Sequence, residues 1–239
     1  MIVLIDAGNT RIKWRRQAEA LGAALDEGAL AHEDVATLTH LRPTAGKTLR
    51  VVGSNVAGTA VAGRIAAALG SAHIEWLRPG QAACGVRNLY ENPFQLGADR
   101  WAALIGARAL HPRASLVVMA GTATTVDLLS ANGDFLGGLI LPGVELMQQS
   151  LASGTAQLPL ASGRFALQPR CTIDAIRSGC LQAQAGAVER MFQQIAAQPD
   201  ALCLLSGGAA DSFAELLHIP LRRIDNLVLH GLATVAASH

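Results

Sequence analysis

The feature that most constrains the fold is a short pattern that occurs twice, about half a chain length apart. Near the N-terminus the apolar run Ile2-Val3-Leu4 leads into Ile5-Asp6-Ala7-Gly8-Asn9-Thr10, and later Leu116-Val117 leads into Val118-Met119-Ala120-Gly121-Thr122-Ala123. Each copy is typical of a buried strand that runs into a hairpin rich in glycine and threonine. Small residues in such a turn let backbone N–H groups approach a ligand. The repetition predicts a duplicated fold with one nucleotide-binding active site between its halves.

The composition describes a compact, apolar chain that packs through small side chains. Of the 239 residues, 51% are hydrophobic and 15% are charged, but only 4% are aromatic. Side chains this small predict close helix–helix and helix–sheet contacts. The net charge of +1 argues against a nucleic-acid-binding protein, because such proteins carry a pronounced basic excess.

We expect neither a targeting segment nor a membrane span. Asp6 interrupts the first apolar run too early for the core of a secretory signal. The longest apolar stretch, 57–69, is broken by Gly and Arg and is too short to cross a bilayer. The four cysteines form no CxxC pair, which favours free thiols in a reducing compartment, and no histidine spacing suggests zinc. We therefore expect a cytoplasmic protein with no membrane or nucleic-acid partner.

Alternating strand-like and helix-like segments predict two α/β domains. The first half is expected to contain strands at 2–6, 12–14, 49–53 and 73–77, helices at 57–69 and 97–110, and a loop-like region at 79–96. The second half is expected to contain strands at 115–119, 124–129, 135–141 and 201–205, helices at 144–151 and 172–197, and two more helices near its end. This order indicates a duplicated fold with mixed sheets. The predicted domains are 1–112 and 113–239.

The first hairpin has the parts of a polyphosphate site. Gly8 allows a tight turn, Asn9 and Thr10 offer polar donors, and Lys13 supplies positive charge. Asp6, at the end of the strand, is suited to hold Mg²⁺ directly or through water. The alternative is an ordinary hairpin whose Asn side chain stabilises the turn. The second copy of the pattern weighs against that alternative.

A second candidate site is Gly97-Ala98-Asp99-Arg100, at the start of the predicted helix. In most helices such an Asp only interacts with the helix dipole, and such an Arg only faces solvent. In the functional interpretation Asp99 accepts a proton, while Arg100 and the free N–H groups of the helix start bind an anionic substrate. Tyr90 and Asn92, in the preceding loop, could line the same pocket. A half-buried loop anchor is an equally good interpretation of Tyr90.

Two further glycine-rich segments are expected to be turns at strand ends: Gly137-Gly138 with Pro142-Gly143, and Ser206-Gly207-Gly208. Each alone is weak evidence, because such turns are common. Together with the two hairpins they predict four loops with accessible backbone around one cleft.

The ordered set of motifs resembles the type III pantothenate kinases. The likeness rests on 6–10 with Lys13, on 97–100 and on 121–127, and the segments 137–143 and 172–179 fit the same pattern. The resemblance implies two RNase-H-like domains of the acetate and sugar kinase/Hsp70/actin superfamily, an actin-like ATPase fold, assembled as a homodimer. The implied activity is phosphorylation of pantothenate by ATP to 4'-phosphopantothenate, the first step of coenzyme A biosynthesis.

The resemblance also implies roles for individual residues. Asp99 would be the general base, Asp6 would hold the Mg²⁺ of Mg²⁺-ATP through water, and Thr172 would reach pantothenate from the partner subunit. The implied ATP-binding set is Asp6, Ala7, Gly8, Asn9, Thr10, Arg11, Ile12, Lys13 and Thr122. The implied pantothenate-binding set is Tyr90, Gly97, Ala98, Asp99, Arg100 and Thr172.

One departure from the family pattern concerns a monovalent cation. Many members carry an Asp two residues before the Gly-Thr of the second hairpin, where it helps to bind K⁺ or NH₄⁺, and this chain has Met119 there. A thioether is a poor ligand for either ion, so we expect little dependence on them. Cys171, where Asn is common, is a milder departure.

Three other functions remain open from the sequence. A different small-molecule kinase on the same fold is the nearest. A polyphosphate or nucleotide hydrolase would share the hairpins but would not need the segment 97–100. A non-catalytic accessory or regulatory protein would have no need of intact Asp6, Lys13, Asp99 and Thr122, so these residues argue against it.

Overall fold

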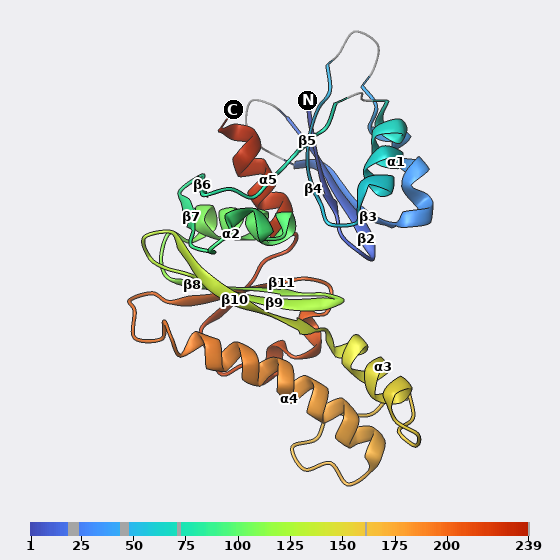
Figure 1. The fold of residues 1–239 in the computed structure, drawn as a ribbon, viewed down its shortest axis with the longest axis vertical. Coiled ribbons are helices and arrows are strands. Elements are labelled where there is room, and N and C mark those ends of the chain that lie inside the picture. Colours follow the sequence, from blue (N-terminus) through green and yellow to red (C-terminus); the bar gives the residue numbers. More distant parts are fainter. Residues whose placement is uncertain (19–23, 44–47, 71–72, 161, 239) are drawn as a thin grey trace. The chain divides into compact units, whose positions relative to one another are not determined.

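The chain forms two compact units (Figure 1) in a computed structural model that describes residues 1–18, 24–43, 48–70, 73–160 and 162–238. Unit 1 comprises Met1–Pro112, Gly133–Phe135 and Asn226–His239, and unit 2 comprises Arg113–Asn132 and Leu136–Asp225. The first change of unit follows Pro112, where the sequence places its domain boundary. The division differs from the expected domain 113–239 because 133–135 and the last helix group with unit 1.

Unit 1 is built on a five-stranded sheet with the order β3-β2-β1-β4-β5. The strands are β1 (Ile2–Ala7), β2 (Arg11–Gln17), β3 (Ala24–Ala31), β4 (Arg50–Asn55) and β5 (Glu75–Trp76). The first three are antiparallel neighbours, whereas β1, β4 and β5 run parallel. Because the central strand β1 is covered on both faces, its first four residues, Ile2–Ile5, form an apolar run rather than an alternating pattern.

Helices cover both faces of this sheet. Ile5 packs in a core with side chains of α1 (Thr59–Leu69) and of the 3-10 segment η1 (His32–Leu41). On the opposite face α2 (Ala98–Leu110) and α5 (Leu227–Ala237) contact the central strands. These two helices cross closely (Figure 1). A Cβ on Gly106 would lie only 2.7 Å from the carbonyl oxygen of Leu227, so the crossing needs a glycine there. The expected close packing through small residues is confirmed at this crossing.

The segment between β5 and α2, expected to be a loop, contains short regular elements. They are β6 (Ala82–Ala83), β7 (Val86–Asn88) and the 3-10 turn η2 (Pro93–Gln95). Strand β7 pairs in parallel with Asp134 and Phe135, and for this reason these two residues group with unit 1.

Unit 2 repeats the strand order of unit 1. Its strands lie in the order β12-β11-β8-β9-β10 and are β8 (Ser115–Ala120), β9 (Ala123–Leu129), β10 (Asp134–Pro142), β11 (Leu202–Ser206) and β12 (Leu221–Arg223). As in unit 1, the central strand has an antiparallel hairpin partner on one side and parallel strands on the other. The predicted duplicated α/β fold with mixed sheets is therefore confirmed.

The core of unit 2 forms between its sheet and a long helix, α4 (Thr172–Phe192) (Figure 1). Leu181 and Val188 of α4 pack in one core with Val118 of β8. Helix α3 (Val144–Gly154) packs on α4. Among the described residues no helix has the length and apolar character needed to cross a membrane.

Three local predictions for the second half are wrong. Helix α4 ends at Phe192 rather than at 197. One of the two expected final helices is a pair of 3-10 turns, η3 (Ala210–Ser212) and η4 (Ala214–Leu216). Gly137-Gly138 lies inside β10 rather than in a turn. Glycine is needed there because a Cβ on Gly138 would lie 2.6 Å from the carbonyl oxygen of Val126 on the neighbouring strand.

Candidate functional site

The first hairpin closes in a tight turn between β1 and β2. The N–H of Gly8 donates to the carbonyl oxygen of Arg11 at 3.1 Å, and Asn9 and Thr10 are exposed at the tip. His32, at the start of η1, supports the turn from outside, because its Nε2 lies 2.9 Å from the carbonyl oxygen of Gly8. A carbonyl oxygen only accepts, so Nε2 is the donor in this bond. The sequence analysis did not single out His32.

Asp6 lies at the end of β1 in an unusual electrostatic environment. Its Oδ1 is buried without a hydrogen-bond partner among the described residues. Burial, reinforced by the negative charge of Asp99, raises the pKa of Asp6 to about 7, although the nearby ammonium of Lys13 lowers it. Lys13 is the register partner of Asp6 on β2, so the two side chains share one face of the sheet. Unit 1 therefore brings Asp6, Lys13 and Asp99 into one charged cluster.

Ser54 of β4, which the sequence analysis missed, lies beside Asp6 in the parallel register. Its hydroxyl is fully buried and, within the described part of the chain, also lacks a hydrogen-bond partner. Neighbouring buried oxygen atoms without partners suit a hydrated Mg²⁺, which takes oxygen ligands and keeps several waters. The described residues contain no group of three or more Asp, Glu, His or Cys that could hold a metal ion. The donor set therefore fits an Mg²⁺ that arrives with a nucleotide.

Helix α2 begins at the predicted segment 97–100. Gly97 is its N-cap residue, and the N–H of Arg100 donates to Oδ1 of Asp99 at 2.8 Å. A Cβ on Gly97 would lie 2.6 Å from the same Oδ1. Any larger residue at 97 would displace this carboxylate, so the glycine is needed for the observed position of Asp99.

Arg100 is buried against two aromatic rings. Its guanidinium carbon lies 5.7 Å from the ring centre of Tyr90 and 5.8 Å from that of Phe135. The face of a guanidinium stacks on aromatic rings, and the N–H groups on its edge match a carboxylate in geometry. Asn88 holds the loop in place, because its Oδ1 accepts the N–H of Tyr90 at 3.1 Å. Neither Phe135 nor Asn88 was identified from the sequence, because nothing local marks them as neighbours of Arg100.

The second hairpin closes between β8 and β9. The N–H of Gly121 donates to the carbonyl oxygen of Ala123 at 3.1 Å, and Thr122 is exposed at the tip. The N–H of Gly143 donates to the carbonyl oxygen of Thr122 at 2.7 Å. Gly207, with a φ of +104°, packs against the end of β8 so closely that no side chain would fit. Three of the four predicted loops therefore meet within unit 2.

The site residues predicted from the sequence are divided between the two units. Unit 1 holds 6–13, Tyr90 and 97–100, whereas unit 2 holds Thr122, Met119 and Thr172. Met119 faces Thr125 across the hairpin register. Thr172 is exposed as the first residue of α4.

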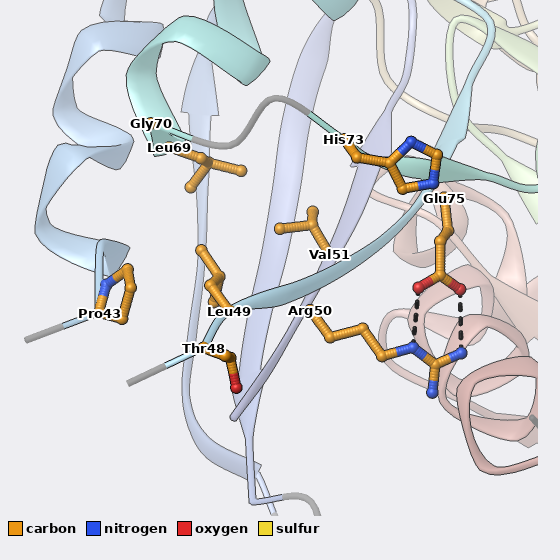
Figure 2. A pocket seen from close by; sticks show the side chains of 9 residues that line it. All are labelled: Pro43, Thr48, Leu49, Arg50, Val51, Leu69, Gly70, His73 and Glu75. Atoms are coloured by element: carbon orange, nitrogen blue, oxygen red, sulfur yellow. Dashed lines mark hydrogen bonds and ion pairs between the residues drawn. The ribbon is translucent and has the colours of Figure 1, made fainter. Parts of the chain in front are cut away.

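A cavity of about 510 Å³ lies at the edge of the unit 1 sheet (Figure 2). It is lined by Pro43, Thr48, Leu49, Arg50, Val51, Leu69, Gly70, His73 and Glu75. Figure 2 shows Arg50 and Glu75 joined by two hydrogen bonds, both of 2.9 Å. This cavity contains none of the candidate residues.

Solved structures with the same fold include proteins of diverse roles. An activator of the 2-hydroxyisocaproyl-CoA dehydratase from Clostridium difficile, with bound ADPNP, matches with a TM-score of 0.53 and 14% identity over 99% of this chain and 93% of that chain. The ethanolamine utilization protein EutJ from Carboxydothermus hydrogenoformans matches with a TM-score of 0.56 and 13% identity over 98% and 88%. At such identities the likeness shows the fold alone, which is the actin-like ATPase fold.

Sequence comparison is more specific. The family model described as type III pantothenate kinase matches residues 2–194. A type III pantothenate kinase of Aromatoleum aromaticum is 61% identical over 99% of this chain and 98% of its own length. One of Azoarcus sp. is 54% identical over 100% and 91%. The chain therefore belongs to the type III pantothenate kinase family.

Proposed function

We propose that this chain transfers the γ-phosphoryl group of ATP to the primary hydroxyl of pantothenate with Asp99 as the general base. The activity follows from the family: the protein is an ATP-dependent pantothenate kinase that acts in coenzyme A biosynthesis. The observation that supports the role of Asp99 is the charged cluster of unit 1. There Asp99 lies close enough to Asp6 to raise the pKa of Asp6.

Phosphoryl transfer depends mainly on positioning and on stabilisation of charge. Asp99 would accept the hydroxyl proton, and its carboxylate is oriented by the N–H of Arg100 and by the absence of a side chain at Gly97. Lys13 and the N–H groups of the first hairpin would stabilise the phosphates. Mg²⁺, held through water near Asp6 and Ser54, would offset negative charge on the β- and γ-phosphates.

Pantothenate carries a carboxylate, and Arg100 is suited to pair with it. Its guanidinium is fixed by Tyr90 and Phe135, so little side-chain freedom would be lost on binding. The backbone at Gly97 and Ala98 would contribute N–H groups from the helix start. Asp99 follows directly, so the pantothenate hydroxyl and the base would belong to one pocket of unit 1.

We further propose a homodimer that forms through unit 2. Large apolar side chains are exposed on β10 and around the start of α4: Leu136, Leu139, Ile140, Leu160, Leu167 and Ile173. Among them Leu167 is 82% exposed and Ile140 is 64% exposed. Exposed apolar surface of this kind is typical of obligate dimer interfaces. Thr172 lies next to Ile173, which supports its assignment to the partner's pantothenate site.

The four free thiols, Cys84, Cys171, Cys180 and Cys203, agree with a cytoplasmic location.

The first experiment is to follow ADP release from Mg²⁺-ATP with and without pantothenate. We expect ADP release that requires pantothenate. Release without pantothenate would instead favour the hydrolase. A folded protein that releases no ADP with any tested alcohol would favour the accessory-protein role.

Subunit mixing tests the contribution of Thr172 from the partner. Asp99→Asn and Thr172→Ala homodimers are each expected to be impaired. A mixed dimer would contain one site with both native residues only if Thr172 acts across the interface. Random mixing of equal amounts makes about half of the dimers mixed, each with one native site of two, so recovery toward about a quarter of the wild-type activity is expected. No recovery would place Thr172 in the site of its own subunit.

A further inference from the structure

Gln184 is a polar side chain in the fully buried face of α4. It is 0% exposed, and its neighbours Leu181, Ala185 and Val188 on the same helix belong to the apolar core of unit 2. Its Nε2 donates to the carbonyl oxygen of Pro142 at 2.8 Å and lies 3.6 Å from the sulfur of Met147. Its Oε1 is buried without a hydrogen-bond partner in the described part of the chain. A buried amide with one unpaired atom costs stability, so packing alone does not account for a glutamine here.

The residue that Gln184 holds is adjacent to the second hairpin. Pro142 ends β10, and Gly143 follows it as the N-cap of α3. The N–H of Gly143 donates to the carbonyl oxygen of Thr122 at 2.7 Å. A Cβ on Gly143 would lie 2.7 Å from that same oxygen, so the two backbone segments are in direct contact. A continuous path of hydrogen bonds and one peptide link thus joins α4 to the tip of the hairpin.

We propose that Gln184 is a positioning residue for nucleotide binding, which fixes Thr122 through the Pro142-Gly143 turn. Thr122 itself is exposed at the tip, so its placement depends on what holds its backbone. The inference rests on the proposed contact between Thr122 and ATP. Helix α4 would then have two roles. Thr172 at its start would contact pantothenate, and Gln184 further along the helix would support the nucleotide hairpin.

The test replaces Gln184 by methionine, which has a similar length but no donor. The affinity for a non-hydrolysable ATP analogue is measured by calorimetry, together with KM for ATP, KM for pantothenate and Tm. Loss of one hydrogen bond predicts a rise of about three- to tenfold in Kd for the analogue and in KM for ATP. KM for pantothenate is expected to stay unchanged. Tm is expected to change little, because two effects on stability oppose each other. The variant loses the stabilising hydrogen bond to Pro142, but it also loses the destabilising buried Oε1 that has no partner among the described residues.

Two control variants separate positioning from general stability. Gln182→Met makes the same substitution at an exposed position of α4 and is expected to behave like wild type. Val188→Ala creates a cavity at a fully buried position of the same core and is expected to lower Tm without changing the ratio of the two KM values.

Two results would overturn the proposal. One is a Gln184→Met protein with the same nucleotide affinity as Gln182→Met. The other is a Gln184→Met protein in which affinities for ATP and pantothenate fall together with Tm, because that pattern indicates a structural role only. Failure of the proposed function would look different from failure of this proposal. In that case the wild-type protein itself would bind the nucleotide analogue but show no turnover that depends on pantothenate.

Discussion

The two hairpins share one backbone plan but carry different chemistry. Asp6-Ala7-Gly8 and Met119-Ala120-Gly121 occupy equivalent places, each at the end of a central strand with an antiparallel partner on one side and a parallel partner on the other. Asp6 has Lys13 across the hairpin, whereas Met119 has Thr125 there. The duplication thus kept the apolar strand pattern, which determines the topology, while the polar positions diverged. At these paired positions unit 1 carries two charged side chains, whereas unit 2 carries a thioether and a hydroxyl.

Each hairpin is also held by one side chain from a distant element. His32 bonds the carbonyl oxygen of Gly8, and Gln184 bonds that of Pro142 beside the second hairpin. In both cases the other polar atom, Nδ1 of His32 or Oε1 of Gln184, is buried without a partner among the described residues. The comparison indicates that the chain accepts a local cost to hold each turn in place.

The largest effect is expected when the charge of Asp99 is removed from unit 1. Asp99→Asn keeps the size of the side chain but cannot accept the hydroxyl proton, so kcat should fall by about 10²–10⁴-fold. The affinity for the ATP analogue should change little. Steady-state kinetics and calorimetry on the same preparation measure both quantities. A kcat near that of wild type would remove Asp99 from the role of base.

A smaller effect, on nucleotide binding, is expected from the hydroxyl of Thr122 in unit 2. Hydrogen bonds to charged groups contribute about 1.5–3 kcal/mol, so Thr122→Ala should raise KM for ATP by about 10- to 100-fold. The exposed Thr37 in η1 provides a matched control, Thr37→Ala, which should leave KM unchanged. An equal KM for ATP in the two variants would contradict the assignment of Thr122 to the nucleotide.

The charge of Asp6 should destabilise the free protein in a pH-dependent way. Folding raises the pKa of Asp6 from 3.8 to about 7. Between these two pH values Asp6 therefore keeps a proton in the folded state that it has lost in the unfolded state. The contribution of Asp6 to stability therefore falls as the pH rises from about 4 to about 7. Asp6→Asn should accordingly be more stable than wild type above pH 7, by at most about 4 kcal/mol, with the difference vanishing near pH 4. Urea unfolding without Mg²⁺ or nucleotide measures it.

Asp174 provides a control of opposite sign for that experiment. Hydrogen bonds from the N–H of Arg164 and from Cys171 lower the pKa of Asp174, so its contribution is present at neutral pH and is lost as the pH falls. Asp174→Asn should therefore be less stable than wild type at neutral pH. A free-energy difference for Asp6→Asn that does not change with pH would refute the electrostatic explanation.

The smallest effect is expected for monovalent cations at Met119. We expect the rate to change by less than about twofold between Na⁺ and K⁺ or NH₄⁺, because a thioether is a poor ligand for these ions. Met119→Asp would place a carboxylate at the position equivalent to Asp6 and should introduce saturable activation by K⁺. A large saturable activation of the wild-type protein would contradict the prediction.

The sequence was informative wherever the evidence is local. Apolar runs identified the central strands β1 and β8, and the glycine-containing segment 97–100 located the start of α2. It was uninformative for β3, an edge strand with an irregular burial pattern, and for the two-residue edge strand β6, whereas the strand predicted at 73–77 corresponds to the shorter β5. Edge strands bury few side chains, so they leave little periodicity to detect.

The sequence by itself determined the duplicated strand topology, the two hairpins and the identity of the polar groups that they carry, because these depend on patterns a few residues long. Only the tertiary structure decided which distant groups adjoin them. Ser54 lies beside Asp6, Phe135 stacks with Arg100, and Gln184 bonds Pro142. The raised pKa of Asp6 is likewise a property of burial and of Asp99, 93 residues along the chain (6 to 99). Such contacts are made by packing between elements, which has no signature in either segment alone.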